Sequence, residues 1–335
     1  MRFVRRYLIP RLIQYLLVTW TGITVVFFIP RLLPGDPVIR RVDTILAWGT
    51  YMEPAAIQDM VRTLREMYGL EAGLFSQYLS FWRRLFTGDF GPSLEMFPVP
   101  VIELIGRAVP WTVGLLFTTM VLTFIVGNIV GGLSGYFSRS SIMKTVDGMV
   151  MMVRPIPYYI FALLVMILLA YILPIFPVGG GITIGMAVAL TWRSIVDVAR
   201  HGFLPALSLI MLGSAATHQT MRLLVQGVKE EAYVKYAKIG NVSERTIFSR
   251  YIMRNAMLPQ ITAFGLTLGM LFGGALITEI VFGYPGLGML AFRAIIAADY
   301  NLLLGMTTLS VLLLTTSILL IDFLYPLFDP RIRLQ

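Results

Sequence analysis

The sequence predicts an all-α polytopic membrane protein with six transmembrane helices, both termini in the cytoplasm and a long external loop between the first two helices. Its 335 residues are 57% hydrophobic and only 13% charged, whereas a soluble protein carries about 25% charged residues. The apolar residues gather in runs of about 20, the length of helix that crosses a hydrocarbon core of about 30 Å. A lipid bilayer is therefore the first expected partner.

The charged residues indicate the orientation. The net charge of +9 is compatible with nucleic-acid binding, but we expect no nucleic acid, because Lys and Arg accumulate in the cytoplasmic loops of membrane proteins. Alternation of six spans assigns all four lysines to cytoplasmic segments: Lys144, Lys229, Lys235 and Lys238. The chain has no cysteine, which excludes disulfides and thiolate metal sites.

Residues 1–30 form the expected cytoplasmic N-terminus and first span. Four arginines precede an apolar run over residues 12–30. A signal peptide has a similar basic head, but this run is long and ends in RLLPGDPV rather than in a small-residue cleavage site. We interpret it as a retained transmembrane helix.

Residues 31–110 form the expected external loop. They contain eight arginines, nine acidic residues and no lysine, and a loop of this length can be translocated whatever its charge. Apolar residues at helical spacing predict helices over residues 54–68 and 75–86. Two interpretations stay open: these helices cap the bundle, or they form a platform for an external partner.

Residues 111–335 form the expected core. Its five spans are predicted at residues 111–136, 142–173, 203–224, 260–282 and 302–324. Pro155 and Pro157 should kink or break the third span, because each proline removes a backbone donor. Residues 283–300 are too apolar for an ordinary loop and suggest a short re-entrant or interfacial helix.

A row of glycines marks the span over residues 260–282. Gly265, Gly269 and Gly273 lie on one face at four-residue spacing. Small residues at this spacing let helices approach closely in lipid. We expect this face to pack against another helix or another subunit.

No catalytic or metal-binding constellation is apparent. A P-loop ends in Gly-Lys-Ser/Thr, and none of the four lysines follows a glycine. His201 and His218 are too far apart for an HExxH zinc site, and there is no Gly-x-Ser-x-Gly elbow. We therefore expect neither an enzyme nor an ATPase. The acidic residues lie near span ends, which disfavours an ion-coupled carrier without excluding one.

The most patterned polar stretch covers residues 226–259, between two spans. Residues 230–239 have helix-forming composition, with Tyr233, Tyr236 and Ala237 on one side. Gly240 and Asn241 tolerate positive φ and predict the end of this helix, and Ser243 is a suitable N-cap for a second helix. A hairpin with small residues at Ala237 and Gly240 would leave room for the surface of a partner.

Several motifs resemble the dipeptide/oligopeptide type of ABC importer permease. EAYVKYAKIGNVSER and RYIMRNAMLP resemble the EAA loop of that family, and GGALITEIVFGYPGLG and DFLYPLFDPRIR are similar to its later motifs. The loop departs from the pattern at the turn: the glycine of the family falls on Asn241, and Gly240 stands one place early. The general acidic position of the loop aligns with Lys235.

The resemblance implies a translocation-pathway subunit of an ATP-driven importer of di- or oligopeptides in a prokaryotic plasma (inner) membrane. It implies a second, homologous permease, two ATPases that bind ATP and Mg, and an extracytoplasmic substrate-binding protein. This chain would need no cofactor. The residues implied to couple it to the ATPase are Glu231, Tyr233, Lys235, Ala237, Gly240, Asn241, Ser243, Glu244 and Arg245. Uptake of oligosaccharides or nickel by the same importer class, and an ion-coupled secondary carrier, stay as alternatives.

Overall fold

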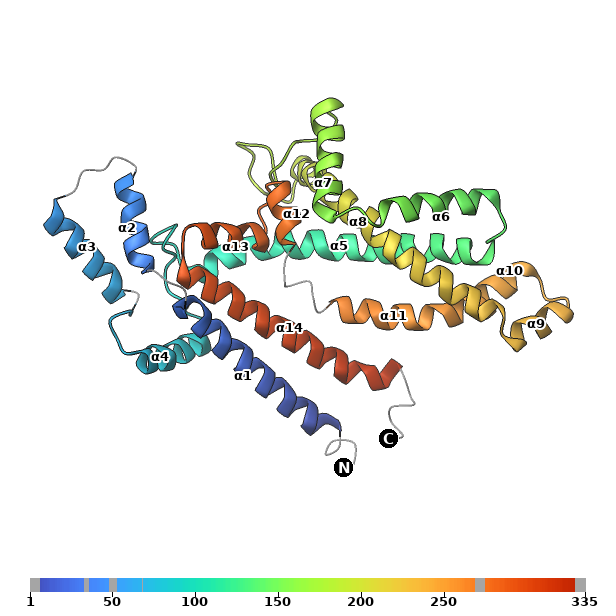
Figure 1. The fold of residues 1–335 in the computed structure, drawn as a ribbon, viewed down its shortest axis with the longest axis horizontal. Coiled ribbons are helices and arrows are strands. Elements are labelled where there is room, and N and C mark those ends of the chain that lie inside the picture. The colour runs from blue at the N-terminus through green and yellow to red at the C-terminus, as the bar shows by residue number, and fades with distance from the viewer. Residues whose placement is uncertain (1–6, 33–35, 48–52, 68, 269–274, 329–335) are drawn as a thin grey trace. The chain divides into compact units, whose positions relative to one another are not determined.

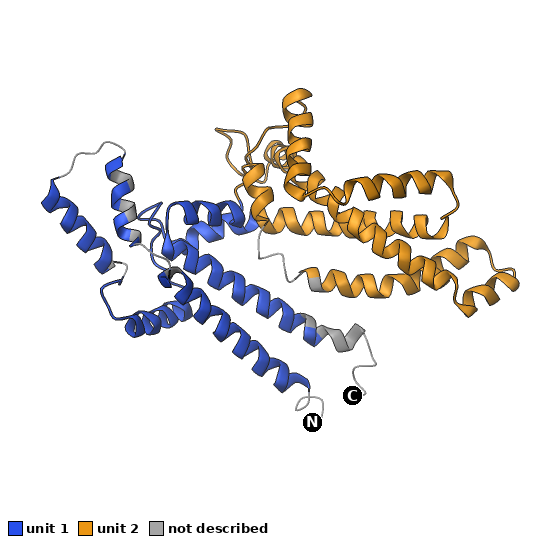
Figure 2. Cartoon of the chain, viewed as in Figure 1, with its two compact units in different colours: residues 1–110, 286–335 blue, residues 111–285 orange. Residues whose placement is uncertain are grey.

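The computed structural model describes residues 7–32, 36–47, 53–67, 69–268 and 275–328 (Figure 1). All regular elements in this part of the chain are helical, and its only β pairing is an isolated bridge between Pro92 and Pro100. The prediction of an all-α membrane protein is confirmed. The chain divides into two compact units, residues 1–110 with 286–335, and residues 111–285 (Figure 2).

The described residues contain four or five candidate membrane spans. Among the described residues, four helices are long and apolar enough to cross a membrane: α1 (Ile9–Leu32), α5 (Val101–Tyr136), α8 (Trp192–Lys229) and α14 (Tyr300–Phe328). A fifth span results if the bent pair α6 (Ser141–Val153) and α7 (Tyr158–Met166) is counted. The fifth predicted span, residues 260–282, overlaps α11 (Arg254–Leu268) and includes α12 (Leu276–Val281), with residues 269–274 outside the described part.

Unit 1 is built on an antiparallel pair of long helices, α1 and α14 (Figure 1). The hydroxyl of Thr19 donates a hydrogen bond to that of Thr315 at 2.9 Å in the middle of the pair. At one end, a guanidinium nitrogen of Arg11 lies 3.3 Å from the Asp322 carboxylate. The start of α1 and the last turns of α14 therefore meet at the same end of the pair.

The described part of residues 31–110, which are predicted to form an external loop, contains three helices. The two predicted helices are confirmed as α3 (Pro54–Met67) and α4 (Leu74–Thr87), and α2 (Pro37–Ala47) was not predicted. The aromatic face of α4 packs on α1, where the Phe27 ring lies 5.3 Å from that of Tyr78 and 5.4 Å from that of Phe81. The capping interpretation thus accounts for α4, and the platform interpretation stays a prediction.

An ion pair links α2 to α3. Asp36 accepts a hydrogen bond from the Val38 amide at 2.8 Å and one from Arg65 at 3.0 Å. Burial raises the pKa of the Asp36 carboxyl, but the hydrogen bonds from Arg65 and Val38 outweigh this effect and leave that pKa below its ordinary value.

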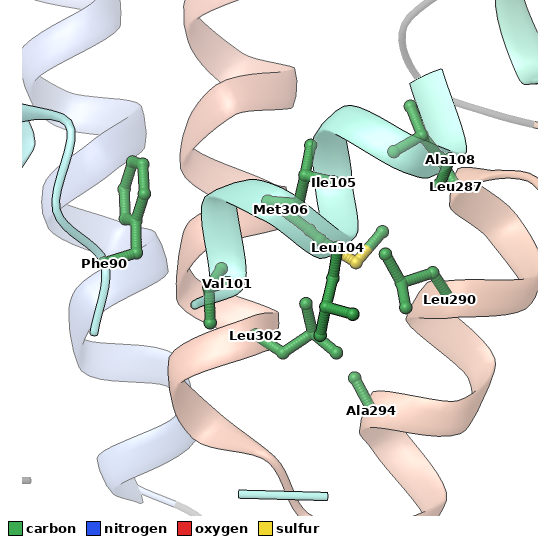
Figure 3. Close-up of a cluster of buried hydrophobic side chains, with 10 residues drawn as sticks. All are labelled: Phe90, Val101, Leu104, Ile105, Ala108, Leu287, Leu290, Ala294, Leu302 and Met306. Carbon is green, nitrogen blue, oxygen red and sulfur yellow. The ribbon is translucent and has the colours of Figure 1, made fainter. Parts of the chain in front are cut away.

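The first turns of α5 pack against α13 (Leu287–Ile296) and α14 in a cluster of ten buried hydrophobic residues (Figure 3). The short apolar helix expected within residues 283–300 is therefore present as α13. Helix α5 begins at Val101, ten residues before the predicted start at Trp111. The predicted span begins with the apolar residues at Trp111, whereas the helix also includes Pro110 and the polar turns before it.

A buried carboxylate holds residues 93–95 against the start of α14. Asp299 is fully buried between α13 and α14. It accepts hydrogen bonds from the Leu302 amide at 3.0 Å, from the Glu95 amide at 3.1 Å and from the Ser93 hydroxyl. One side chain thus caps α14 and holds residues 93–95 in place.

Unit 2 contains the rest of α5 together with α6, α7, α8, α11 and α12. The break predicted at Pro155 and Pro157 is confirmed, because α6 and the helical segment 158–172 meet at 105°. Helix α8 begins at Trp192, eleven residues before the predicted start at 203, and the Thr191 hydroxyl accepts a hydrogen bond from the Ser194 amide at this end.

Three glycines bring α5 and α8 into close contact. A Cβ added to Gly131 would lie 2.4 Å from the His218 carbonyl oxygen, and one added to Gly135 would lie 2.7 Å from the Arg222 carbonyl oxygen. Gly127 meets the Thr217 side chain in the same way. These helices can pack at this distance only because the glycines carry no side chain.

The other predicted glycine row is only partly described. Gly269 and Gly273 lie outside the described residues. Gly265 has open space beside it, since an added Cβ would meet no heavy atom within 4 Å. Its role at an interface stays a prediction.

Candidate functional site

Residues 226–259 form a helical hairpin at one end of unit 2 (Figure 1). Helix α9 (Ala232–Ile239) follows the end of α8. After a turn, α10 (Glu244–Thr246), a π-helical segment (Ile247–Met253) and α11 continue as one helical run. The two predicted helices and the turn between them are confirmed.

A hydrophobic core lies inside the hairpin. The buried side chains in this core come from α5, α8, α9 and the returning helix: Tyr136, Met221, Val225, Val234, Ala237, Ile247, Ile252 and Ala256. Ala237 is only 9% exposed. The expectation that Ala237 leaves room for a partner is therefore wrong. Val234 and Ala237, three residues apart, form the inward face of α9, and the tyrosines face away from it.

The outward face of α9 carries large apolar side chains. Tyr236 is 73% exposed and Ile239 is 80% exposed, with Tyr233 also at the surface. Lys235 lies 3.4 Å from Glu230 in an exposed ion pair beside them. Ile239 is not among the coupling residues predicted above. Its position gives a signal, since a β-branched apolar residue precedes the turn of an otherwise polar helix.

The turn is closed by a Schellman motif. The Val242 amide donates to the Ala237 carbonyl at 3.1 Å, and the Asn241 amide donates to the Lys238 carbonyl at 3.1 Å. Asn241 has a φ of 55°, whereas Gly240 has a φ of −73°. The asparagine therefore occupies the left-handed position that most helix ends give to glycine. Val242 packs on the hairpin core, which completes the motif.

Substitutions at Asn241 should change the stability of the turn without changing the rest of the hairpin. A β-branched residue in the left-handed region costs about 1–2 kcal/mol, whereas glycine has no such cost. We expect Asn241→Val to speed hydrogen exchange of the Asn241 and Val242 amides roughly tenfold. Asn241→Gly should leave the exchange rates nearly unchanged. Equal rates in the two variants would contradict the assigned turn.

The remaining predicted residues flank the turn. Glu231 precedes α9 and is exposed, as is Arg245 in α10. Ser243 precedes α10, but its hydroxyl pairs with that of Thr246 at 2.8 Å and caps no backbone amide. The expected side-chain N-cap is thus absent at this serine. Glu244 accepts a hydrogen bond from the Tyr136 hydroxyl of α5.

Lys229 fastens the other side of the hairpin to α5. Its ammonium donates to the Tyr136 carbonyl oxygen at 2.9 Å and lies 5.3 Å from the centre of the Tyr136 ring. The end of α5 therefore contacts both the beginning of the hairpin, at Lys229, and its second helix, at Glu244.

Four polar side chains at the base of the hairpin form a network that no motif in the sequence predicts. Asp147 of α6 is buried. Its carboxylate lies 3.0 Å from Arg222 and 3.3 Å from His218, both on α8, and accepts a hydrogen bond from Ser134 of α5. These residues come from three helices, so no regular spacing in the sequence indicates that they lie together. The described residues contain no group of three or more His, Asp or Glu side chains placed to hold a metal.

Comparison with known proteins gives a consistent family. The family described as "Binding-protein-dependent transport system inner membrane component" matches residues 127–334. The chain is 31% identical to the oligopeptide transport system permease protein AppB of Bacillus subtilis, over 93% of this chain and 94% of AppB. It is 27% identical to the oligopeptide transport system permease protein OppB of Haemophilus influenzae, over 98% of this chain and 99% of OppB.

The similar proteins also include a permease of a dipeptide transport system. The dipeptide transport system permease protein DppB of Lactococcus lactis is 24% identical, over 98% of this chain and 99% of DppB. The family match covers the hairpin, the α5–α8 contact and every later helix. The chain belongs to the family of inner-membrane components of binding-protein-dependent transport systems.

Proposed function

We propose that this protein is the translocation-pathway subunit of an ATP-driven importer of di- or oligopeptides in a prokaryotic inner membrane. Relatives that match over almost their whole length carry dipeptide or oligopeptide transport in their names. The observation that carries the proposal is the hairpin: its core is packed against α5 and α8, while its outer face exposes Tyr236 and Ile239.

The proposed complex gives this chain three kinds of partner. A second, homologous permease completes the pathway, and an extracytoplasmic binding protein delivers the peptide. Two ATPases, each seated on the hairpin of one permease, bind ATP and Mg. This chain then needs no cofactor and no ATPase site of its own. Large exposed apolar side chains on a polar loop are typical of protein interfaces, and tyrosine is among the residues enriched there.

The proposed topology has six spans with both ends of the chain in the cytoplasm. The meeting of Arg11 and Asp322 supports placing the two ends on the same side of the membrane. The lysines of the hairpin support placing residues 226–259 in the cytoplasm. The external loop, residues 31–110, is then on the outer face, where the binding protein docks.

Uptake measurements test the proposal. Cells that lack this chain should lose uptake of labelled di- and tripeptides, and the wild-type chain should restore it. Depletion of ATP with the proton gradient intact should abolish the restored uptake, whereas collapse of the gradient with ATP retained should not. Uptake that survives ATP depletion and follows the proton gradient would indicate an ion-coupled carrier instead. Restored uptake of oligosaccharides or nickel, without peptide uptake, would change the substrate class and retain the importer.

A further inference from the structure

A cavity of about 420 Å³ lies within unit 2, between α5, α8 and α11. It is lined by the polar side chains of Thr119, Thr123, Thr217, Gln260 and Thr267, together with apolar residues. None of the described residues that line it is charged. Its volume falls in the range of small-molecule sites, about 300–1,000 Å³.

The cavity lies at the depth of the membrane. Its residues on α5 and α8 occupy the middle of two helices that are long and apolar enough to span the bilayer. Polar side chains at this depth are costly when they face lipid and are typical of substrate pathways. The side-chain nitrogen of Gln260 donates to the Thr217 carbonyl oxygen at 3.5 Å, and its side-chain oxygen can accept a hydrogen bond from an occupant of the cavity.

The hydroxyls are prepared to accept hydrogen bonds. Three of them donate to a carbonyl oxygen of their own helix: Thr119 to Leu116 at 3.0 Å, Thr217 to Gly213 at 3.1 Å, and Thr267 to Phe264 at 2.8 Å. Each hydroxyl proton is thus engaged, and the oxygen lone pairs remain. Such a surface suits a ligand that is rich in N–H donors, as a peptide main chain with its terminal ammonium is.

One wall of the cavity is aromatic. The rings of Phe124 and Phe264 lie 4.6 Å apart between centroids. Gly213 brings α8 close to α5 there, since an added Cβ would lie 2.8 Å from the Thr123 side chain. An apolar wall accepts aliphatic or aromatic groups of a ligand, and an uncharged lining neither attracts nor repels charged ones strongly.

We propose that this cavity is a binding site on the translocation pathway, which holds the main chain of a short peptide through Thr119, Thr217, Gln260 and Thr267. The proposal rests on the peptide-import function proposed above. The site selects for main-chain N–H groups and accepts side chains of either charge. An importer of peptides with varied sequences needs such a site.

A charge placed at the rim of the cavity tests the proposal. Ala263 lines it and is exposed. Ala263→Glu should slow uptake of an acidic tripeptide at least about tenfold relative to a lysine-containing tripeptide, and Ala263→Lys should produce the reverse preference. The matched control is Ile261 on the same helix, which does not line the cavity. The Ile261→Glu and Ile261→Lys variants should change uptake of the two peptides by equal factors.

The absence of cysteine from the chain provides a test that does not depend on folding with a buried charge. The Ala263→Cys variant folds and assembles with an uncharged side chain at residue 263. It is then treated with a negatively or positively charged methanethiosulfonate, which forms a mixed disulfide with the thiol and releases methanesulfinate. The sign of the reagent should set the peptide preference, and excess peptide should slow the modification. The Ile261→Cys variant should show neither effect.

The results of these experiments distinguish failure of the proposed binding site from failure of the proposed peptide-import function. The binding site would be overturned, and the function left intact, by the following combination of results. The wild-type chain takes up peptides, no Ala263 variant prefers peptides of one charge, and excess peptide does not slow modification of the Ala263→Cys variant. Failure of the wild-type chain to support any peptide uptake would overturn both proposals.

Discussion

Replacing Ile239 with arginine should release the ATPase from the permease and abolish peptide uptake, without unfolding the protein. Ile239 is 80% exposed and is the last residue of α9, next to the turn. Central interface residues typically cost about 2 kcal/mol or more when they are lost, which is roughly a 30-fold loss of affinity. A charge on the apolar face adds a desolvation cost. Tyr236→Ala should act in the same direction.

The measurement combines co-purification of the ATPase with the thermal unfolding midpoint of the solubilised permease. Ile239→Arg should lower the amount of ATPase that co-purifies and leave the thermal unfolding midpoint unchanged within error. The contrasting variant is Ala237→Arg, only two residues earlier. It places a charge in the hairpin core and should lower both quantities. Normal co-purification of the Ile239→Arg variant would show that the ATPase does not dock on this face of α9.

Replacing Gly131 with alanine should destabilise the permease strongly, whereas the same change at Gly114 of the same helix should not. A Cβ at Gly131 would lie 2.4 Å from a carbonyl oxygen of α8, and a Cβ at Gly114 would meet no heavy atom within 4 Å. Overpacking costs about 1–3 kcal/mol. Alanine also gains up to about 1 kcal/mol of helix propensity, but this gain is common to both positions. We therefore expect the free energies of unfolding of the two variants to differ by about 1–3 kcal/mol, the cost of overpacking.

The Gly114→Ala variant is the control, because its chemical change and its helix are identical. Unfolding of both variants is measured in the same detergent, together with peptide uptake in membranes. The Gly131→Ala variant should also lose uptake, since the close contact lies directly below the hairpin. Equal stability of the two variants would mean that α5 and α8 are not packed at the distance described above.

The predicted elements differ in how far periodicity alone could locate them. The helices α1, α3, α4 and α14 were found because apolar spacing and length are local properties of the chain. The starts of α5 and α8 were missed by ten and eleven residues. Their first turns contain charged residues, which the hydropathy of a span does not include, and Pro110 lies inside α5 although proline commonly marks a helix end.

In the hairpin too, the local features were predictable from the sequence, whereas the burial of individual side chains was not. Its two helices, its turn and its charge were evident from residues 226–259, because composition and turn residues act locally. Which face of α9 is buried was not evident. Val234 and Ala237 face inward because α5, α8 and the returning helix supply Tyr136, Met221 and Ile252, residues far away in the chain.

Length, hydropathy and short motifs were enough to predict an α-helical membrane component with a charged hairpin and no ATPase motif, because these features can be recognised without knowing which residues lie next to them in space. Only the tertiary structure brought Asp147 to Arg222 and His218, exposed Ile239 while burying Ala237, and opened the threonine-lined cavity between α5, α8 and α11. Each of these features depends on distances between helices that are separate in the chain. Those distances are set by packing, most clearly where Gly131 lets α5 approach the backbone of α8.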